Sequence, residues 1–307
     1  MICKNGISAK IICDSISSTT GTRLTTMEIE YPRFILAEVN THRMLSKNSA
    51  SSRAIPIKSI NDMVVTKPAK PIHWGANQAG MQASNEVDDK EMADIVWNAS
   101  ASRAVQSSEA LQQVGLHKQI VNRVTEPFQM MKTIISGTEW QNLFWLRDHD
   151  DAQPEFHELA RCIRSEYEAG AHTAKVLVPG AWHLPYVHTN LKGDGTLRYY
   201  ADIERKEEID LETAQKISAS CCAQVSYRKL DDSLDKAITL YDRLVGSDRK
   251  HSSAFEHCGT PIDLQQNVRS QLWQDGVTHA DRYGNMWSGN FKGWIQYRQL
   301  IPGHVKW

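Results

Sequence analysis

The segment from Thr25 to Arg43 constrains the fold of this chain more than any other, because it joins a strand pattern directly to a helical one. Apolar and polar residues alternate over Thr25–Tyr31, which predicts a β-strand. Pro32 follows and suits the first turn of a helix. That helix carries an apolar stripe, which His42 and Arg43 continue at helical spacing. Polar groups that point inward require partners, so we expect a polar site at the end of this helix.

The remaining patterns predict one α+β domain over residues 1–307, in which helices flank a mixed sheet. The serine-rich stretch Leu45–Ser59 is predicted to be irregular, and residues 60–110 read as a long insertion. Residues 176–200 are predicted to be loop with short strands, and Gly259–Val268 a further strand. Helices are predicted over Glu91–Val114, Phe128–Arg147, Pro154–Gly170, Leu211–Cys222, Leu234–Val245 and Phe291–Leu300.

Composition places the chain among ordinary soluble proteins. Apolar residues make up 41% and charged residues 23% of its 307 residues. The net charge of −1 argues against a broad nucleic-acid or membrane surface, but it allows a focused basic pocket. The six cysteines lack CxxC spacing, which favours reduced, mostly buried thiols. No apolar run is long enough to span a membrane, so we expect a cytoplasmic protein.

The densest group of polar residues is the sequence THRMLSKNSASSR, from Thr41 to Arg53. Hydroxyl and amide groups supply neutral hydrogen bonds there, while arginine supplies a planar charged fork that matches phosphate oxygens. This mixture suits a nucleotide phosphate better than a metal. The alternative is structural: His42 and Arg43 stabilise a helix C-terminus, and a serine-rich loop follows.

Two further clusters carry polar residues of the same kinds. The second combines Arg123 with a stretch that ends at Arg147; its alternative is a surface arginine beside a core helix. The third combines AQVSY, from Ala223, with HSSAFEH, from His251, and lacks the spacing of a zinc site. The pair His149-Asp150 resembles those of metal-dependent phosphohydrolases, but an acidic, solvated turn is the better interpretation. We therefore expect no metal.

Together these clusters resemble the flavin-dependent thymidylate synthase family. The family pattern RHRxxSxNxxSxR is similar to THRMLSKNSASSR, and the family's Leu-Arg motif followed by Ala-Gln-x-Glu is similar to LRDHDDAQPE. The family's Ala-Arg-Val-Ser looks like AQVS, and its His-x-x-Pro-Phe-Glu-His looks like HSSAFEH. In the usual order these last two motifs come first, whereas here they follow. The arrangement is similar to a permuted variant, like the longer complementing proteins of phages, for which the host cytoplasm would be the location.

The resemblance implies dUMP as substrate, with FAD, NADPH and 5,10-methylenetetrahydrofolate as cofactors. It also implies a homotetramer whose subunits share sites. Ser51, Arg53 and Arg147 would act in catalysis, and Ser49 and Arg123 would join them in binding the nucleotide. The residues that would contact the flavin are His42, Arg43, Met44, Ser46, Asn48, Asn142, Ser226, His251, Ser253 and Glu256.

Several positions depart from the family pattern. Thr41 replaces the first arginine of its motif, Gln224 replaces the arginine of Ala-Arg-Val-Ser, and Ala254 replaces proline. Ser49 and Ala54 stand where the family usually has a glutamate and an aromatic residue. These departures leave two alternatives to dTMP formation. One is hydroxymethylation of dUMP or another pyrimidine nucleotide, and the other is a non-catalytic nucleotide-binding paralogue.

Overall fold

A central sheet of five strands organises the chain, with the order β3-β4-β2-β1-β5. A computed structural model describes residues 1–193, 196–201, 204, 206–225, 233–246, 250–266 and 272–306. Neighbouring strands are antiparallel except β1 and β5, which are parallel. The strands are β1 (Ser8–Ser17), β2 (Arg23–Pro32), β3 (Ser46–Ser49), β4 (Met130–Gly137) and β5 (Lys175–Leu177). The mixed α+β class expected from the sequence is confirmed.

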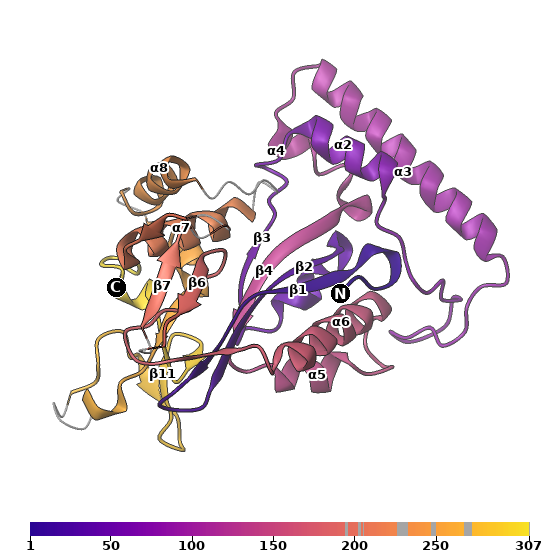
Figure 1. The fold of residues 1–307 in the computed structure, drawn as a ribbon. Coiled ribbons are helices and arrows are strands. Elements are labelled where there is room, and N and C mark those ends of the chain that lie inside the picture. Colours follow the sequence, from indigo (N-terminus) through magenta and orange to yellow (C-terminus); the bar gives the residue numbers. More distant parts are fainter. Residues whose placement is uncertain are drawn as a thin grey trace.

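One face of this sheet is covered by α5 (Gln141–Arg147) and α6 (Pro154–Gly170) (Figure 1). Helix α6 begins as its sequence predicts, because Pro154 occupies its first turn and the Gln153 side chain accepts a hydrogen bond from Phe156 N at 2.9 Å. The residues at odd positions of β2 join an apolar core with the two helices. Its members include Met27, Ile29, Tyr31, Ile135, Trp140, Phe156 and Leu159, each at most 1% exposed.

The other face of the sheet is more polar and supports the C-terminal part of the chain. Thr26 and Glu28 of β2 lie on this face, beside Leu24. A β-bulge between Ile11 and Cys13 changes the alternation of β1. Residues of β1 before the bulge pack toward α6, whereas Ser15 after it contacts the C-terminal part.

A chain of buried hydrogen bonds joins that polar face to the C-terminal part. Ser15 contacts His183 Nδ1 at 2.9 Å, and His183 Nε2 contacts Thr26 at 2.9 Å. Thr26 contacts Ser136 at 2.6 Å, and Ser136 contacts His257 Nδ1 at 2.9 Å. Burial lowers the pKa of each histidine to about 3, and the neighbouring His257 adds to the effect on His183. Both histidines are therefore neutral in the folded protein.

The C-terminal part consists of helices and small sheets on the polar side. Helices α7 (Leu211–Gln224) and α8 (Leu234–Val245) pack against each other (Figure 1). The 3₁₀ segments η5 (Ser252–His257) and η6 (Tyr297–Leu300) pack together beside them. The small sheets contain β6 (His188–Leu191), β7 (Leu197–Tyr200) and β8 (Glu208–Ile209); β10 (His279–Ala280), β11 (Met286–Ser288) and β12 (Phe291–Lys292); and β9 (Gly259–Pro261) with β13 (Trp294–Gln296).

Between β3 and β4 the chain forms a helical arm that extends beyond the sheet (Figure 1). It contains α2 (Ile57–Thr66), α3 (Lys90–Gln113) and the short α4 (Lys118–Val121). Asp89 caps α3 by accepting a hydrogen bond from Met92 N at 2.8 Å. The arm includes residues 60–110, which the sequence predicted to be an insertion. That they are an insertion stays a prediction, because the fold of one chain does not show which segments its relatives lack.

The structure confirms the expected strand at Thr25–Tyr31 and the expected helices at α3, α6, α7 and α8. Four other expectations are wrong, at least in part. Phe128–Arg147 contains strand β4 before α5, and Leu45–Ser59 contains β3 and the start of α2. Phe291–Leu300 forms β12, β13 and η6 rather than a helix. The helix after Pro32 is only η2 (Arg33–Ile35) and α1 (Leu36–Asn40), so His42 and Arg43 lie beyond its end.

The strand expected over Gly259–Val268 is present only as β9, and Val268 lies outside the described residues. No helix in the described ranges is long and apolar enough to cross a membrane.

Acid should destabilise this fold before most of its carboxylates titrate. The unfolded chain takes up protons at His183 and His257 near the ordinary histidine pKa of 6.5, whereas the folded chain resists them to about pH 3. Their stabilising effect is complete above pH 6.5 and is lost as the pH falls toward 3. Each histidine should lower the free energy of unfolding by about 1.4 kcal/mol per pH unit within that window.

Urea unfolding at pH 7, 6, 5 and 4.5 measures this slope. His42, whose pKa burial also lowers to about 4, adds to this slope, so the variant His257→Gln should lose about a third of it relative to wild type. A free energy of unfolding that stays flat from pH 6.5 to 5 would contradict the assignment.

Candidate functional site

Strand β3 positions the motif residues at the edge of the central sheet. Ser46, Lys47, Asn48 and Ser49 pair in order with residues 136 to 133 of β4. These side chains are polar because they bond to neighbouring elements rather than fill an apolar layer. Asn48 Nδ2, for example, donates to Cys222 O of α7 at 2.7 Å. This bond ties the edge strand to a helix that lies 174 residues away in the sequence.

The turn that follows β3 presents Ser51 and Arg53. Backbone N–H groups of Ala54 and Ile55 both donate to Ser51 O, at 2.9 and 3.2 Å. Ala50 and Ile55 are buried with Ile60 of α2 in a small apolar cluster. These apolar anchors fix both ends of the turn, while the Arg53 side chain stays exposed.

A cavity of about 790 Å³ opens beside this turn. Four basic side chains line it, namely Arg53, Lys118, Arg243 and His251. Hydroxyl and amide groups are added by Asn48, Ser51, Gln119 and Ser253, and apolar groups by Ala54, Ala223, Leu240, Leu244 and Ala254. None of these described lining residues is an aspartate or glutamate. The cavity is therefore electropositive and suited to an anionic ligand.

Three distant segments meet at this cavity, which we call the basic cavity. The turn after β3, helix α4 and the pair α8–η5 each contribute side chains. The meeting is held by an apolar cluster in which Ile134 of β4 packs with Cys222, Ala223, Leu240 and Ala254. The sequence clusters that begin at Thr41, Ala223 and His251 are thus brought together in space.

A second cavity, of about 410 Å³, lies near the other end of β3. Arg43, Ser46, Lys47 and Glu256 line it, together with Asn40, Leu45, Gly289, Asn290, Gln296, Arg298 and Gln299. Burial lowers the pKa of Lys47 to about 8, with Glu256 opposing the shift. We call this the amide cavity, because four of its side chains are amides.

Gln296 holds the amide cavity together. Its Nε2 lies 3.2 Å from Ser46 Oγ, 3.0 Å from Glu256 O and 2.9 Å from Asn290 Oδ1, and the residue is only 2% exposed. Glu256 also forms an ion pair with Arg298. Gly289 has a φ of +59°, and a Cβ there would lie 2.5 Å from Gln296 Oε1. The backbone at Gly289 therefore favours glycine on both steric and conformational grounds.

His42 and Arg147 form a separate pair beside α6. Arg147 Nε donates to His42 Nε2 at 3.1 Å, and its guanidinium lies 4.9 Å from the centre of the Phe156 ring. Burial, Arg147 and Lys47 lower the pKa of His42 to about 4. His42 is therefore neutral and carries its proton on Nδ1, since Nε2 accepts the hydrogen bond.

The comparison with protein families agrees with the motifs. A family model described as "Thymidylate synthase complementing protein" matches residues 6–171, which is more than half of the chain. The chain belongs to the thymidylate synthase complementing protein family. The match includes β1 to β4 and the turn that carries Ser51 and Arg53, but it ends before α7 and η5.

Solved structures give weaker likenesses. One is the UMP/dUMP methylase PolB from Streptomyces cacaoi bound with 5-Br dUMP, at 13% identity and a TM-score of 0.42, covering 56% of this chain and 93% of that one. The same enzyme bound with 5-Br UMP gives 14% identity and a TM-score of 0.41, covering 54% and 89%. The search of curated proteins found no match.

The residues that the family motifs single out are divided between several places. Ser51, Arg53, Asn48, His251 and Ser253 line the basic cavity, although the last three were predicted to contact flavin. Arg43, Ser46 and Glu256 line the amide cavity. His42 and Arg147 pair with each other and line neither cavity. The predicted roles of all these residues stay predictions.

Arg123, Asn142, Met44 and Ser49 line neither of these cavities. Arg123 has a side chain that is 54% exposed and pairs with Glu126 at 3.2 Å. Asn142 is exposed, Met44 is 42% exposed, and Ser49 accepts a hydrogen bond from Thr133 at 2.8 Å. Ser226 lies outside the described residues. Sequence reasoning missed Lys118, Arg243 and Gln296, because no motif marks them.

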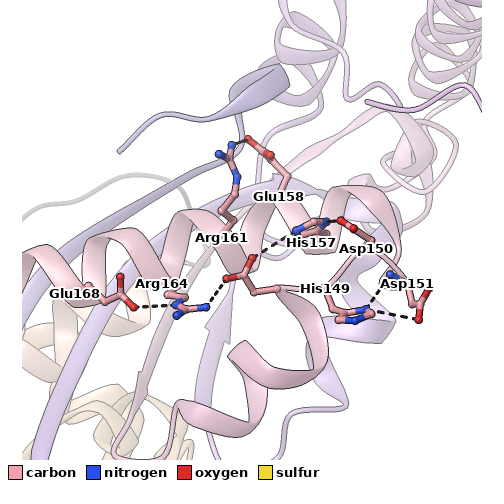
Figure 2. Close-up of polar contacts among 9 residues, drawn as sticks. His149, Asp150, Asp151, His157, Glu158, Arg161, Arg164 and Glu168 are labelled. Carbon is pink, nitrogen blue, oxygen red and sulfur yellow. Dashed lines mark hydrogen bonds and ion pairs between the residues drawn. The ribbon is translucent and has the colours of Figure 1, made fainter.

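The acidic turn after α5 is part of a charged surface (Figure 2). His149 and Asp151 interact on the turn, and Asp150 has a fully exposed side chain. Asp148 accepts from Arg164 at 3.0 Å and lies 3.5 Å from His157 of α6. Within the described part of the chain, no three His, Cys, Asp or Glu side chains are placed to hold a metal ion.

Replacing Gln296 should destabilise the protein. Gln296→Ala leaves buried acceptors at Ser46, Glu256 and Asn290 without this donor, which should cost about 1–3 kcal/mol of unfolding free energy. Gln106→Ala, an exposed change on α3, should stay within about 0.5 kcal/mol of wild type. Urea unfolding of both variants measures the difference, and equal losses would remove Gln296 from this role.

Proposed function

We propose that the protein transfers a one-carbon unit from 5,10-methylenetetrahydrofolate to C5 of dUMP and forms dTMP, with FAD and NADPH. Family membership supports thymidylate synthase-type chemistry. The observation that carries the proposal is the basic cavity, where Ser51 and Arg53 lie among basic side chains and the described lining residues include no carboxylate. A nucleotide monophosphate has the charge that this wall requires.

Within this proposal the basic cavity holds the nucleotide. Arg53 binds the phosphate through its charged fork, and Ser51 supplies a hydroxyl that orients the uracil ring. Orientation matters because a substrate held in the reactive geometry has already lost its translational and rotational entropy, which lowers the activation barrier of the reaction. The apolar cluster that contains Cys222 and Ala254 borders this cavity, and its low polarity strengthens polar contacts made beside it.

The residues of the amide cavity fit a polar heterocycle such as the flavin ring. Amide side chains offer both donors and acceptors, and Lys47 and Arg43 add positive charge. The buried Nε of Arg298 has no hydrogen-bond partner among the described residues, so a donor is free there. When bound, FAD reduced by NADPH would supply the hydride that completes the methyl group. Arg43, Ser46 and Glu256 would hold the FAD.

Arg147 and His42 lie outside both cavities, although the family pattern assigns them to nucleotide and flavin. We propose that they act in the site of a neighbouring subunit in a homotetramer. Trp145 on the same helix is 77% exposed and Leu146 is 43% exposed, which suits an interface better than a monomer surface.

A second candidate is hydroxymethylation, in which water instead of hydride completes the transfer. Two departures from the family pattern favour keeping it. Thr41 stands where the family pattern has an arginine, and its Oγ1 accepts a hydrogen bond from Arg147 at 3.3 Å. Arg147 therefore supplies a guanidinium here, but the second guanidinium of the family pattern is replaced by a hydroxyl. Gln224 is 3% exposed and bonds to Ser220 at 3.3 Å within α7. Both changes remove positive charge from the predicted flavin residues.

Product analysis decides between these candidates. The purified protein should show a bound-flavin spectrum. In the presence of FAD, NADPH and methylenetetrahydrofolate, it should convert dUMP to a product with the mass of dTMP. A product heavier by one oxygen would favour hydroxymethylation. Protein that binds dUMP but takes up no FAD would be a non-catalytic paralogue.

Arg53→Ala tests the nucleotide assignment. Loss of a charged, multiply bonded contact should raise the Kd for dUMP about ten- to a hundredfold. Calorimetric titration measures the change, and Arg103→Ala, an exposed arginine of α3, should leave the Kd unaltered. An unchanged Kd in Arg53→Ala would remove this residue from the phosphate site.

A further inference from the structure

Two cations that no motif marks lie in the wall of the basic cavity. Lys118 begins α4, in the helical arm, and Arg243 lies in the last turn of α8. They approach from elements on different sides of the turn that carries Arg53. Together with Arg53 they place three permanent positive charges around one cavity.

Carboxylates in the described part of the chain do not neutralise the charges of Arg53 and Arg243. Among the described residues, neither Arg53 nor Arg243 has a carboxylate within ion-pair distance, whereas Arg23, Arg164 and Arg298 each have one. Lys118 Nζ donates to Ala54 O at 2.8 Å, which uses one of its three donors. Like charges that converge without a counter-charge repel each other, so a bound anion stabilises the arrangement.

The positions of both residues are fixed by packing. Leu240, one turn before Arg243, is 9% exposed and packs with Ile134 and Ala254. Lys118 is held by its bond to Ala54, the residue that follows Arg53. These anchors fix the backbone from which both cations extend, so a ligand has to order only their side chains.

We infer that Lys118 and Arg243 bind the nucleotide phosphate together with Arg53. The inference rests on the proposed function and adds the residues that select a phosphorylated nucleotide over a nucleoside. A phosphate dianion presents several oxygens, so a guanidinium fork from α8 and an ammonium from α4 can bind it from different directions. Arg123, whose exposed side chain pairs with Glu126, lines neither described cavity.

Binding of dUMP and of deoxyuridine to Arg243→Ala and Lys118→Met tests the inference. Each variant should raise the Kd for dUMP about ten- to a hundredfold and leave the Kd for deoxyuridine unchanged. Arg243→Lys, which keeps the charge, should recover part of the loss. The control Arg103→Ala should match wild type for both ligands, and thermal unfolding shows that each variant is folded.

The outcomes separate the two proposals. Wild-type protein that binds dUMP, with Arg243→Ala and Lys118→Met binding it equally well, would overturn the inference and leave the proposed function standing. Wild-type protein that does not bind dUMP would overturn the proposed function. Inorganic pyrophosphate would then test the cations alone: weaker binding in both variants would keep them as an anion site, and equal binding would overturn that as well.

Discussion

Docking of the C-terminal part onto the polar face of the central sheet is the interaction on which the site depends. Thr26, Ser136 and Ser15 offer hydroxyls there, and His183 and His257 bond to them. A buried hydroxyl without its partner costs about 1–3 kcal/mol, so this interface tolerates few alternative arrangements. Its precision carries over to β3, because Asn48 and Ser46 bond to the same C-terminal part.

The sequence was informative where the two faces of an element differ in polarity. The alternation of β2 predicted a strand because its apolar face joins the core while its polar face meets the C-terminal part, and the apolar stripes of α6 and α8 predicted helices with one buried side and one exposed side. Strand β4 is buried on both faces, so its Met and Ile residues gave no alternation and resembled a helix stripe. Strand β3 is polar because its side chains bond across to other elements, and it resembled a loop.

The site was predictable as a set of motifs and not as a geometry. Residue types showed that Arg53 and His251 belong to polar clusters, and the structure brings them to one cavity. Nothing in a local pattern indicates that Arg243 lines the same cavity as Arg53, because that depends on the packing of α8 against β4. Glu256 was assigned by its motif, but its partner Arg298 becomes visible only when the C-terminal strands are placed.

The difference in polarity between the two sheet faces also predicts the order in which the two halves of the chain fold. The apolar core beneath β2 is built entirely from residues between Cys3 and Tyr167, so it requires no contribution from later residues. The opposite face carries the hydroxyls of Thr26 and Ser136 and the carboxylate of Glu28, which water can solvate before the C-terminal part docks. We therefore expect the first half to collapse early and the second half to dock slowly onto a wet surface, as larger chains commonly assemble in stages.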